Sequence, residues 1–366
     1  MKTIVTITGI RPDFIRMSKI FDKLDKNFKH IMIHTGQHYN DELSKIFFYD
    51  LNIRKPDYTL ECGQNSKNHY EQLSYLAKEL VPLVKTINPD IVLFLGDSNS
   101  AMIAPTLFKE GFRIGHIEGG MRSYDKRMME EINRVLCDYV SDPVFVYTPL
   151  YKKRLIHENH DPKNIHVVGN TITEIIKEFM PMIKSTCKYR GGGYILADIH
   201  RNENLNIDEY THIITYLSNL PYHIKLVKFN RALPIIRQWL EEDNKDSLLN
   251  RGISLVGPYG FIDYLKLQYE AYGIVSDSGT AQEEAALLGV PVAVPRNYTE
   301  RPESIDNGNS ILIGESINKN GLTVISDQLK RTREFFTNYK FKPKMIKWLG
   351  DGNTSQKIIE ILTEIL

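Results

Sequence analysis

Short apolar runs rich in β-branched residues alternate along the whole chain with longer segments whose apolar residues recur at helical spacing. The helical spacing is clearest between Tyr70 and Lys85, where leucine and valine residues fall on one stripe. Because alternating strands and helices build βαβ units, the pattern predicts an α/β fold with mainly parallel sheets. In the first half, strands are expected at residues 3–8, 30–34, 91–95, 113–117, 144–147 and 166–168.

The pattern restarts after a polar, glycine-rich stretch at residues 184–193, which is the best candidate for an interdomain linker. Two Rossmann-like domains facing across a cleft are therefore expected, one at residues 1–170 and the other at residues 171–345. Residues 346–366 are expected to form a C-terminal helix that crosses back to the first domain. In the second half, strands are expected at residues 194–197, 223–227, 253–256, 273–276 and 290–294.

Composition narrows the possible partners and the cellular setting. The 366 residues are 42% hydrophobic and 25% charged, which is enough for two cores of ordinary domain size. The 46 Lys and Arg residues nearly balance 45 Asp and Glu residues, so a broad basic surface for nucleic acid or anionic lipid is excluded. Three widely spaced cysteines, without a signal peptide pattern or a long apolar run, predict a cytoplasmic protein that does not cross a membrane.

The first strand leads into a loop suited to a small anion. Gly9 permits close backbone approach, Arg11 supplies a charged fork, and Arg16 lies about one helical turn further on. These residues predict a phosphate site at the N-terminus of the following helix. The alternative is that Arg11 pairs with a nearby carboxylate.

Carboxylates gather where the next strands end. Asp97 and Glu118 each lie at the carboxyl end of an expected strand, and Glu130 and Glu131 follow nearby. Converging acids bind cations or sugar hydroxyls, or share protons. This set lacks the His and Cys spacing of a zinc site and the motifs of magnesium-dependent phosphate transfer, so we expect no metal.

Two polar clusters follow strands of the second half. His200 and Arg201 combine an imidazole and a guanidinium directly after one strand. Ser278 and Gly279 open a helix after another strand, where exposed backbone N–H groups suit an anion, and Glu284 is placed to accept hydrogen bonds from a ribose. The alternative interpretation of the second cluster is a simple helix cap by Ser278.

The ordered motifs of the whole chain resemble those of the non-hydrolysing UDP-N-acetylglucosamine 2-epimerase family. The resemblance covers nearly the full length, and so many motifs in order are very specific. The motifs are GIRPDFIRMSKI at 9–20, HTGQHY at 34–39, GDSNS at 96–100, HIEGGMRS at 116–123, EEINR at 130–134, GNT at 169–171, HRNEN at 200–204, SDSGTAQEEAALLGVPV at 276–292, ERPE at 300–303 and GDGNTS at 350–355.

The resemblance implies a GT-B-like pair of domains and a UDP-sugar 2-epimerase, an isomerase that needs no cofactor or metal. It also implies a homodimer, a UDP-sugar substrate and a role in polysaccharide biosynthesis. Members of the family eliminate UDP to leave a 2-acetamidoglucal and then add UDP back after proton delivery to the opposite face of C2. The residues that the resemblance makes catalytic are Asp97, Glu118, Glu130 and His200. Those that it assigns to UDP are Arg11, Arg16, Arg201, Phe261, Tyr264, Ser278, Gly279, Glu284 and Arg301.

Departures from the family pattern leave alternatives open. Gly119 replaces the usual alanine after Glu118, and the region of Lys228 and Phe229 lacks the histidine with which relatives contact the nucleotide. The base is therefore expected against Tyr264 or Phe261. Alternative substrates include a modified UDP-sugar such as UDP-2,3-diacetamido-glucuronate. Alternative activities on this fold are a hydrolysing epimerase, a UDP-sugar glycosyltransferase and a non-catalytic UDP-sugar sensor.

Overall fold

A computed structural model describes residues 1–37, 48–187, 189–201, 204–229, 232–242, 247–316 and 324–366. Four residues of the predicted motifs, His38, Tyr39, Asn202 and Glu203, lie outside this described part. The chain divides into two compact units, which are treated separately below. Unit 1 comprises Met1–Glu178 and Trp348–Leu366, and unit 2 comprises Phe179–Lys347.

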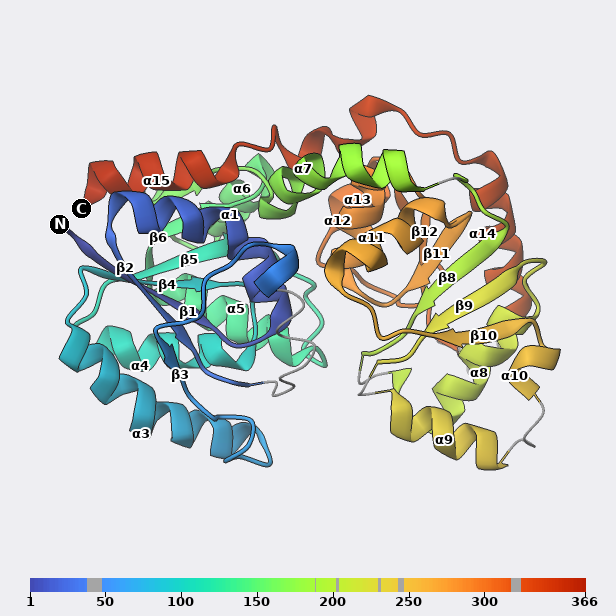
Figure 1. Ribbon diagram of the computed structural model, residues 1–366, viewed down its shortest axis with the longest axis horizontal. Helices are drawn as coiled ribbons and strands as arrows, with labels where there is room; N and C mark the ends of the chain where they lie inside the picture. The colour runs from blue at the N-terminus through green and yellow to red at the C-terminus, as the bar shows by residue number, and fades with distance from the viewer. Residues whose placement is uncertain (38–47, 188, 202–203, 230–231, 243–246, 317–323) are drawn as a thin grey trace. The chain divides into compact units, whose positions relative to one another are not determined.

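Unit 1 is built on a parallel sheet with helices on both of its faces (Figure 1). The seven described strands lie in the order β3-β2-β1-β4-β5-β6-β7, and every pairing is parallel. The strands are β1 (Thr3–Thr8), β2 (Lys29–His34), β3 (Tyr58–Thr59), β4 (Ile91–Leu95), β5 (Ile114–Gly119), β6 (Ser141–Val146) and β7 (Ile165–Val167). The helices and 3-10 turns are α1 (Arg11–Asn27), α3 (His69–Ile87), η1 (Asn99–Ile103), α4 (Ala104–Lys109), α5 (Met129–Val140), α6 (Pro149–His157), η2 (Pro162–Asn164), α7 (Thr171–Thr186) and α15 (Thr354–Ile365).

The central strands of unit 1 are continuous apolar runs rather than alternating ones. All residues of β4, with the sequence IVLFL, are buried. This is the pattern of parallel strands whose two faces are both covered by helices. The polar residues that follow such a strand are the first that reach solvent, which places chemistry at its carboxyl end.

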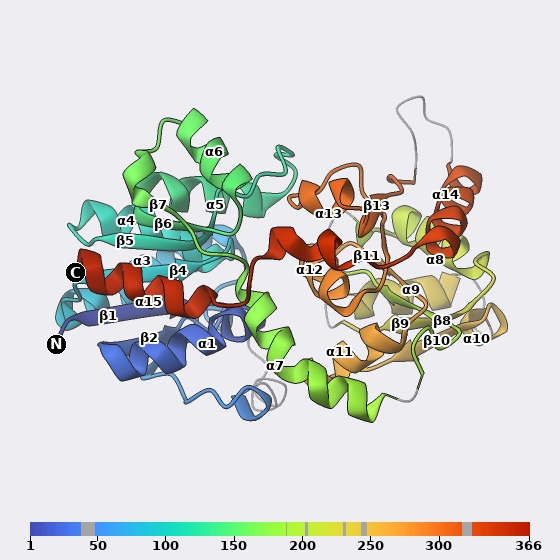
Figure 2. The ribbon, with the colours of Figure 1, turned by 90° about the horizontal axis from the view of Figure 1, so that it is seen from above.

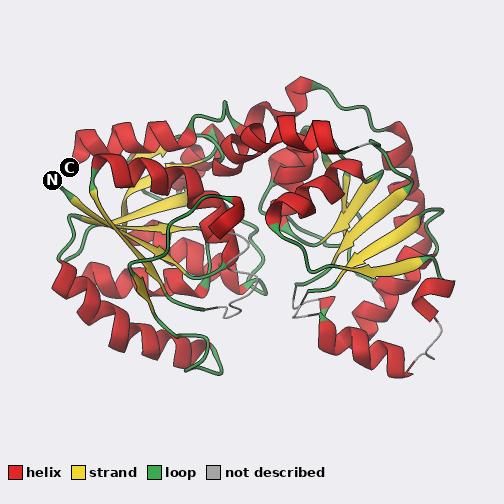
Figure 3. Cartoon of the chain, viewed as in Figure 1, coloured by secondary structure: helices red, strands yellow, loops and turns green. Residues whose placement is uncertain are grey.

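Unit 2 repeats this architecture around a second parallel sheet (Figure 3). Its six described strands lie in the order β10-β9-β8-β11-β12-β13. The strands are β8 (Tyr194–Asp198), β9 (His223–Val227), β10 (Ile253–Val256), β11 (Gly273–Ser276), β12 (Val292–Val294) and β13 (Ser310–Leu312). The helices are α8 (Ile207–Ser218), α9 (Leu233–Glu242), α10 (Ser247–Asn250), α11 (Phe261–Glu270), α12 (Gly279–Leu288), α13 (Pro302–Asp306) and α14 (Ile325–Asn338), followed by the 3-10 turn η4 (Pro343–Leu349).

The predicted α/β class is confirmed, and each strand expected from the sequence is present within a few residues. Five of them, β1, β4, β9, β10 and β11, have the expected bounds. The short edge strands β3 and β13 were not expected, because two or three residues are too few to show a periodic pattern. Among the described helices, none is both long and apolar enough to span a bilayer.

The boundary between the compact units falls inside α7, between Glu178 and Phe179, rather than at the end of a helix. The glycine-rich segment beyond α7 is tied to unit 2, because the Gly192 N–H donates to the Glu270 carbonyl at 2.6 Å. The chain returns to unit 1 through α15, which lies beside α1 in both ribbon views (Figures 1 and 2). Lys23 donates to the Gln356 Oε1 at 3.1 Å across this helix pair.

Candidate active site

The loop between β1 and α1 is shaped by close packing. A side chain at Gly9 would collide with the Ser100 hydroxyl, so only glycine fits there. The Asp13 carboxylate accepts the backbone N–H groups of Gly9 at 2.7 Å and Ile10 at 3.1 Å, which fixes the loop at the start of the helix. Arg11 is the first residue of α1 and is partly buried, which lowers the pKa of its guanidinium. Its predicted contact with a phosphate stays a prediction.

Arg16 and Glu118 form a buried ion pair. The Arg16 Nη1 lies 2.9 Å from the Glu118 Oε2, and both side chains are less than a tenth exposed. The Tyr147 hydroxyl lies 3.2 Å from the same two atoms and 2.9 Å from the Thr171 hydroxyl. In this structure Arg16 therefore holds a catalytic candidate in place, and its predicted contact with a diphosphate stays a prediction.

Asp97 is held by a second arginine. It follows β4 directly after Gly96, and its Oδ2 is paired with the Arg134 Nη2. The Arg134 Nη1 bonds the Glu131 carboxylate at 2.8 Å. The Asn133 amide also donates to the Asp97 backbone carbonyl at 2.9 Å, so α5 fixes both the main chain and the side chain of Asp97. The Asp97 side chain is nevertheless 27% exposed and can meet a ligand.

Glu118 lies close to the same strand end. Its backbone φ of 77° is in the left-handed region that non-glycine residues rarely adopt. A Cβ added at Gly96, the residue before Asp97, would lie 3.7 Å from the Glu118 Oε2. The charges of Asp97 and Glu118, together with the larger effect of burial, raise the pKa of Asp13 to about 7. Three carboxyl groups thus share one region of unit 1, and Asp13 was not predicted to be among them.

The fully buried His116 belongs to a hydrogen-bond network at the ends of β4 and β5. The His116 Nε2 donates to the Gly96 carbonyl at 2.8 Å, and its Nδ1 lies 2.7 Å from the Asp138 Oδ1. The other Asp138 oxygen accepts the Gly120 N–H at 3.0 Å and the Arg122 Nη1 at 2.7 Å. Because a carbonyl only accepts and an ionised carboxylate also accepts, the ring carries both of its protons. One buried network therefore fixes the turn that carries Asp97 and the end of β5 that carries Glu118.

The protonation of this network follows from its charges. Burial alone would lower the pKa of His116, but the Cys137 sulfur and the Asp138 carboxylate hold it well above its ordinary value. Burial alone would raise the pKa of Asp138, but His116 and Arg122 lower it to about 2. Sequence reasoning missed this network, although a histidine inside a strand between two apolar residues was a visible signal.

The two neighbouring acids of α5 have different surroundings. Glu131 is buried and accepts the backbone N–H groups of Ser123 at 3.0 Å and Tyr124 at 2.9 Å, besides its bond to Arg134. This is a structural role. Glu130 lies in the first turn of α5 and is only partly buried, and its predicted catalytic role stays a prediction.

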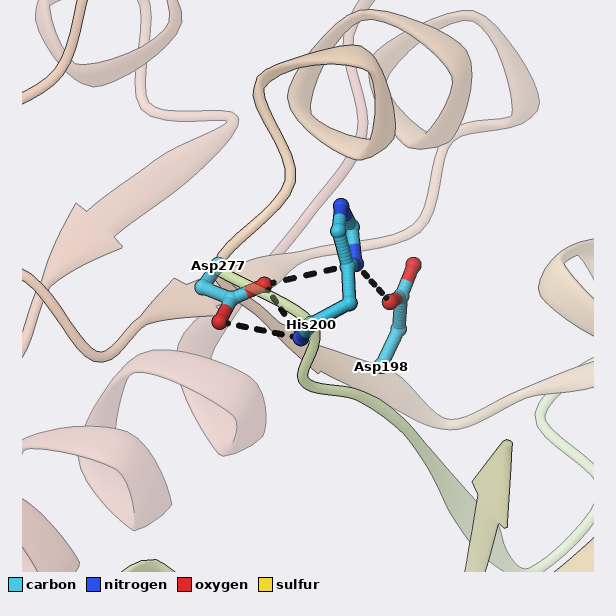
Figure 4. Close-up of side chains that lie close together, drawn as sticks. All are labelled: Asp198, His200 and Asp277. Atoms are coloured by element: carbon cyan, nitrogen blue, oxygen red, sulfur yellow. Dashed lines mark hydrogen bonds and ion pairs between the residues drawn. The ribbon is translucent and has the colours of Figure 1, made fainter. Parts of the chain in front are cut away.

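In unit 2, His200 lies between two aspartates (Figure 4). Its Nδ1 is 2.7 Å from the Asp198 Oδ1 and 3.5 Å from the Asp277 Oδ1. Asp277 is fully buried and accepts the backbone N–H groups of His200 at 3.1 Å and Arg201 at 3.0 Å, as well as the Asn204 amide at 2.9 Å. The Asp277 carboxylate thus fixes the turn after β8 that presents His200.

Tyr264 and Phe261, the residues expected near uracil, are placed by α11. The Tyr264 hydroxyl donates to the Asp198 Oδ2 at 2.6 Å. Phe261 is 3% exposed and its ring packs edge-on against Phe179 at 6.4 Å between centroids. Neither placement tests a contact with the base. The Asp198 pairing was not predicted, because the sequence places Asp198 directly after the expected strand at residues 194–197 and does not indicate its distant partner Tyr264.

The loop before α12 has the features expected of an anion site. Ser278 occupies the N-cap position, but its hydroxyl lies 2.9 Å from the Thr280 hydroxyl and caps no backbone N–H, so the alternative of a simple cap is not seen. A side chain at Gly279 would collide with Arg301. The Glu284 Oε2 accepts a hydrogen bond from the Gln268 amide at 2.7 Å, which orients the carboxylate.

Arg301 and Arg201 share a carboxylate partner. Arg301 pairs with Glu300 at 2.5 Å and Glu283 at 2.8 Å, and the Arg201 Nη2 lies 3.6 Å from the same Glu300 oxygen. Glu300 is 1% exposed, so these cations are held in a buried network beside Gly279. Their predicted role toward UDP stays a prediction.

Among the described residues, Asp198, His200 and Asp277 also bring ligand atoms within 4.8 Å of one another, close enough for a metal ion. Their contacts argue for another use. Both Asp277 oxygens already accept protein N–H groups, and both Asp198 oxygens are engaged by His200 and Tyr264. Because the oxygens of both carboxylates already accept hydrogen bonds, the cluster is better suited to holding a protonated histidine than to binding a metal ion.

A sequence model of the family described as UDP-N-acetylglucosamine 2-epimerase matches residues 22–363, almost the whole chain. The chain belongs to this family. The UDP-N-acetylglucosamine 2-epimerase of Methanococcus maripaludis is 34% identical over 377 residues, which cover 99% of this chain and 98% of that protein. A like-named protein of Methanocaldococcus jannaschii is 33% identical and covers 98% of both chains.

Solved structures agree with this assignment. The crystal structure of the Methanocaldococcus jannaschii UDP-GlcNAc 2-epimerase in complex with UDP-GlcNAc and UDP superposes with a TM-score of 0.88 at 31% identity, over 99% of each chain. Phytolacca americana UGT2 superposes with a TM-score of 0.60 at 11% identity, over 100% of this chain and 99% of that one, and this likeness concerns the fold alone. Together they confirm the predicted GT-B-like class.

Proposed function

We propose that this protein is a non-hydrolysing UDP-N-acetylglucosamine 2-epimerase that interconverts UDP-GlcNAc and UDP-ManNAc for surface polysaccharide precursors. One observation carries the proposal beyond family membership: the carboxylates of Asp97 and Glu118 lie at the ends of neighbouring parallel strands, each oriented by its own buried arginine. Inversion at a carbon needs proton removal from one face and proton return to the other, and hence two acid–base groups.

The two proton transfers at C2 are assigned to two different acid–base groups. A carboxylate takes the proton from C2, the C1–O bond breaks, and its electron pair leaves with UDP, so that a C1–C2 double bond remains in a 2-acetamidoglucal. UDP then adds back to C1 as a second group delivers a proton to the opposite face of C2. The candidates for these two roles are Asp97, Glu118 and Glu130. Negative charge grows on the diphosphate, which is where a cationic His200 is needed.

UDP is assigned mainly to unit 2. The backbone N–H groups of Ser278 and Gly279 at the start of α12 suit the diphosphate. Arg201 and Arg301 are proposed to supply positive charge beside them. Glu284 is proposed to bind the ribose, and Tyr264 and Phe261 to lie near the base. Arg11 and Arg16, in the first two turns of α1, are proposed as further diphosphate contacts.

We also propose a cytoplasmic homodimer. The outward face of α5 supports it, because apolar residues recur there at helical spacing and remain between 38 and 79% exposed. A contiguous exposed apolar stripe is typical of an interface, and a stripe on one helix can bury itself against its own copy across a two-fold axis. The stripe consists of Met129, Ile132, Val135, Leu136 and Tyr139.

Incubation with UDP-GlcNAc in deuterated water tests the activity. Every turnover through the glucal should introduce deuterium at C2, so NMR is expected to show labelled UDP-ManNAc and labelled UDP-GlcNAc. Free N-acetylmannosamine together with UDP would contradict the proposal and indicate a hydrolysing enzyme. Deuterium uptake only into UDP-2,3-diacetamido-glucuronate would contradict the proposed substrate.

A further inference from the structure

We propose that Asp198 and Tyr264 are positioning residues that hold His200 by its Nδ1, so that its Nε2–H alone faces the departing diphosphate. This inference rests on the proposed function, in which His200 stabilises that leaving group. It assigns the Tyr264 hydroxyl a positioning role, which is separate from the proposed contact of the Tyr264 ring with the base.

The two aspartates around His200, Asp198 and Asp277, have different structural roles. Asp277 is bound by main-chain and amide N–H groups and so fixes the turn. Asp198 makes the short contact with the ring, at 2.7 Å from Nδ1. The second ring nitrogen points away from both carboxylates (Figure 4). A histidine whose Nδ1–H is held by a carboxylate has a fixed tautomer and a fixed ring plane.

Tyr264 completes this arrangement from α11. Its hydroxyl donates to the second Asp198 oxygen at 2.6 Å, so both carboxylate oxygens have partners and the carboxylate cannot rotate freely. Burial, reinforced by the neighbouring Asp198 charge, raises the pKa of Tyr264 well above its ordinary value, which keeps the phenol a donor. The result is a chain of tyrosine, aspartate and histidine drawn from α11, the end of β8 and the following turn.

The charges that face His200 favour its protonated form. Burial alone would lower the pKa of His200, but Asp198 and Asp277 raise it above its ordinary value against an opposing effect of Arg201. The Phe229 ring adds an apolar neighbour, with 5.0 Å between the two ring centroids. A charged Nε2–H donor aimed at a diphosphate stabilises the transition state more than a neutral donor does.

The test compares Asp198→Asn and Tyr264→Phe with the wild-type enzyme and with Asp263→Asn, an exposed carboxylate one position before Tyr264. In Asp198→Asn the amide oxygen still accepts Nδ1–H but carries no charge. The alkaline limb of the kcat profile should therefore move to lower pH by about one unit or more. At pH 8, kcat should fall about 10-fold while the affinity for UDP stays within about two-fold. Asp263→Asn should behave as wild type.

Tyr264→Phe distinguishes the two roles of the tyrosine. If the hydroxyl positions Asp198, kcat should fall about three- to ten-fold with little change in the affinity for UDP. If only the ring matters, as a surface for the base, phenylalanine should substitute without effect, and that result would overturn the role of Tyr264.

Nitrogen-15 NMR of His200 in the ligand-free protein provides a readout independent of turnover. Asp198→Asn should lower the pH at which the ring titrates, whereas an unchanged titration and an unchanged pH profile would overturn the inference. Failure of the proposed function has a different signature, because the wild-type enzyme itself would then incorporate no deuterium from solvent. A folded variant is verified by its near-UV circular dichroism.

Discussion

At the scale of single residues, the candidate acids of unit 1 are not isolated carboxylates. Each has its own arginine, Arg134 for Asp97 and Arg16 for Glu118. A charge-assisted bond to an arginine fixes the carboxylate and favours its ionised form. Both groups are therefore held in one orientation. Burial, together with their charges, raises the pKa of Asp13 to about 7, which limits the negative charge of the cluster.

We predict that Asp97→Asn and Glu118→Gln each reduce turnover about 100-fold or more, because an amide can neither take nor return a proton. The affinity for UDP should change little, since neither carboxylate is assigned to UDP and most of the proposed UDP contacts belong to unit 2. Steady-state kinetics and calorimetric titration with UDP measure the two effects. Glu110→Gln, a change in a surface carboxylate paired with Lys85, is the matched control. Full activity of either variant removes that residue from the catalytic set.

The residues predicted from the sequence and the residues that it did not indicate differ in one respect. Asp97, Glu118 and His200 are predicted as site residues because each follows or ends a strand, which is a local pattern. Asp138 and Asp198 were missed because their importance lies in what they touch. Asp138 is 22 positions from His116, and Tyr264 is 66 positions from Asp198. A pattern of neighbouring residues does not contain such pairings.

At the scale of elements, the buried His116 of β5 bonds the Gly96 carbonyl just after β4 and pairs with Asp138 of α5. His116 has a raised pKa, so its contribution to stability is full below the unfolded value near 6.5 and is lost only as pH rises through the higher folded value. Asp138 has a lowered pKa, so its contribution is full above the unfolded value of 3.8 and is lost as pH falls toward about 2. Between these limits the ion pair is complete.

We predict that Asp138→Asn lowers the free energy of unfolding by about 3–5 kcal/mol at neutral pH, because it leaves His116 as a buried charge without its partner and leaves Arg122 with Glu158 alone. Urea unfolding at pH 7 measures the loss. Asp142→Asn, which removes a half-exposed carboxylate from a surface pair with Arg113, should cost less than about 1 kcal/mol. Equal effects of the two changes would show that the buried network does not stabilise the sheet.

At the scale of the whole molecule, the α5 stripe bears on assembly. We predict that Val135→Lys and Leu136→Lys convert a dimer to a monomer, because a charge on each copy of a two-fold interface opposes its own counterpart. Size-exclusion chromatography with light scattering measures the mass. Thr211→Lys, an equal change in an exposed residue of α8, should leave the dimer intact. A monomeric wild-type protein would refute the homodimer.

The return of the chain to α1 through α15 also sets an order of events during synthesis. Residues 1–178 leave the ribosome first, yet the helix that covers α1 is made only with residues 348–366. Unit 2 is continuous in sequence and can therefore complete its fold earlier than unit 1. Until α15 docks, the nascent chain leaves uncovered the face of α1 that α15 contacts in the folded protein.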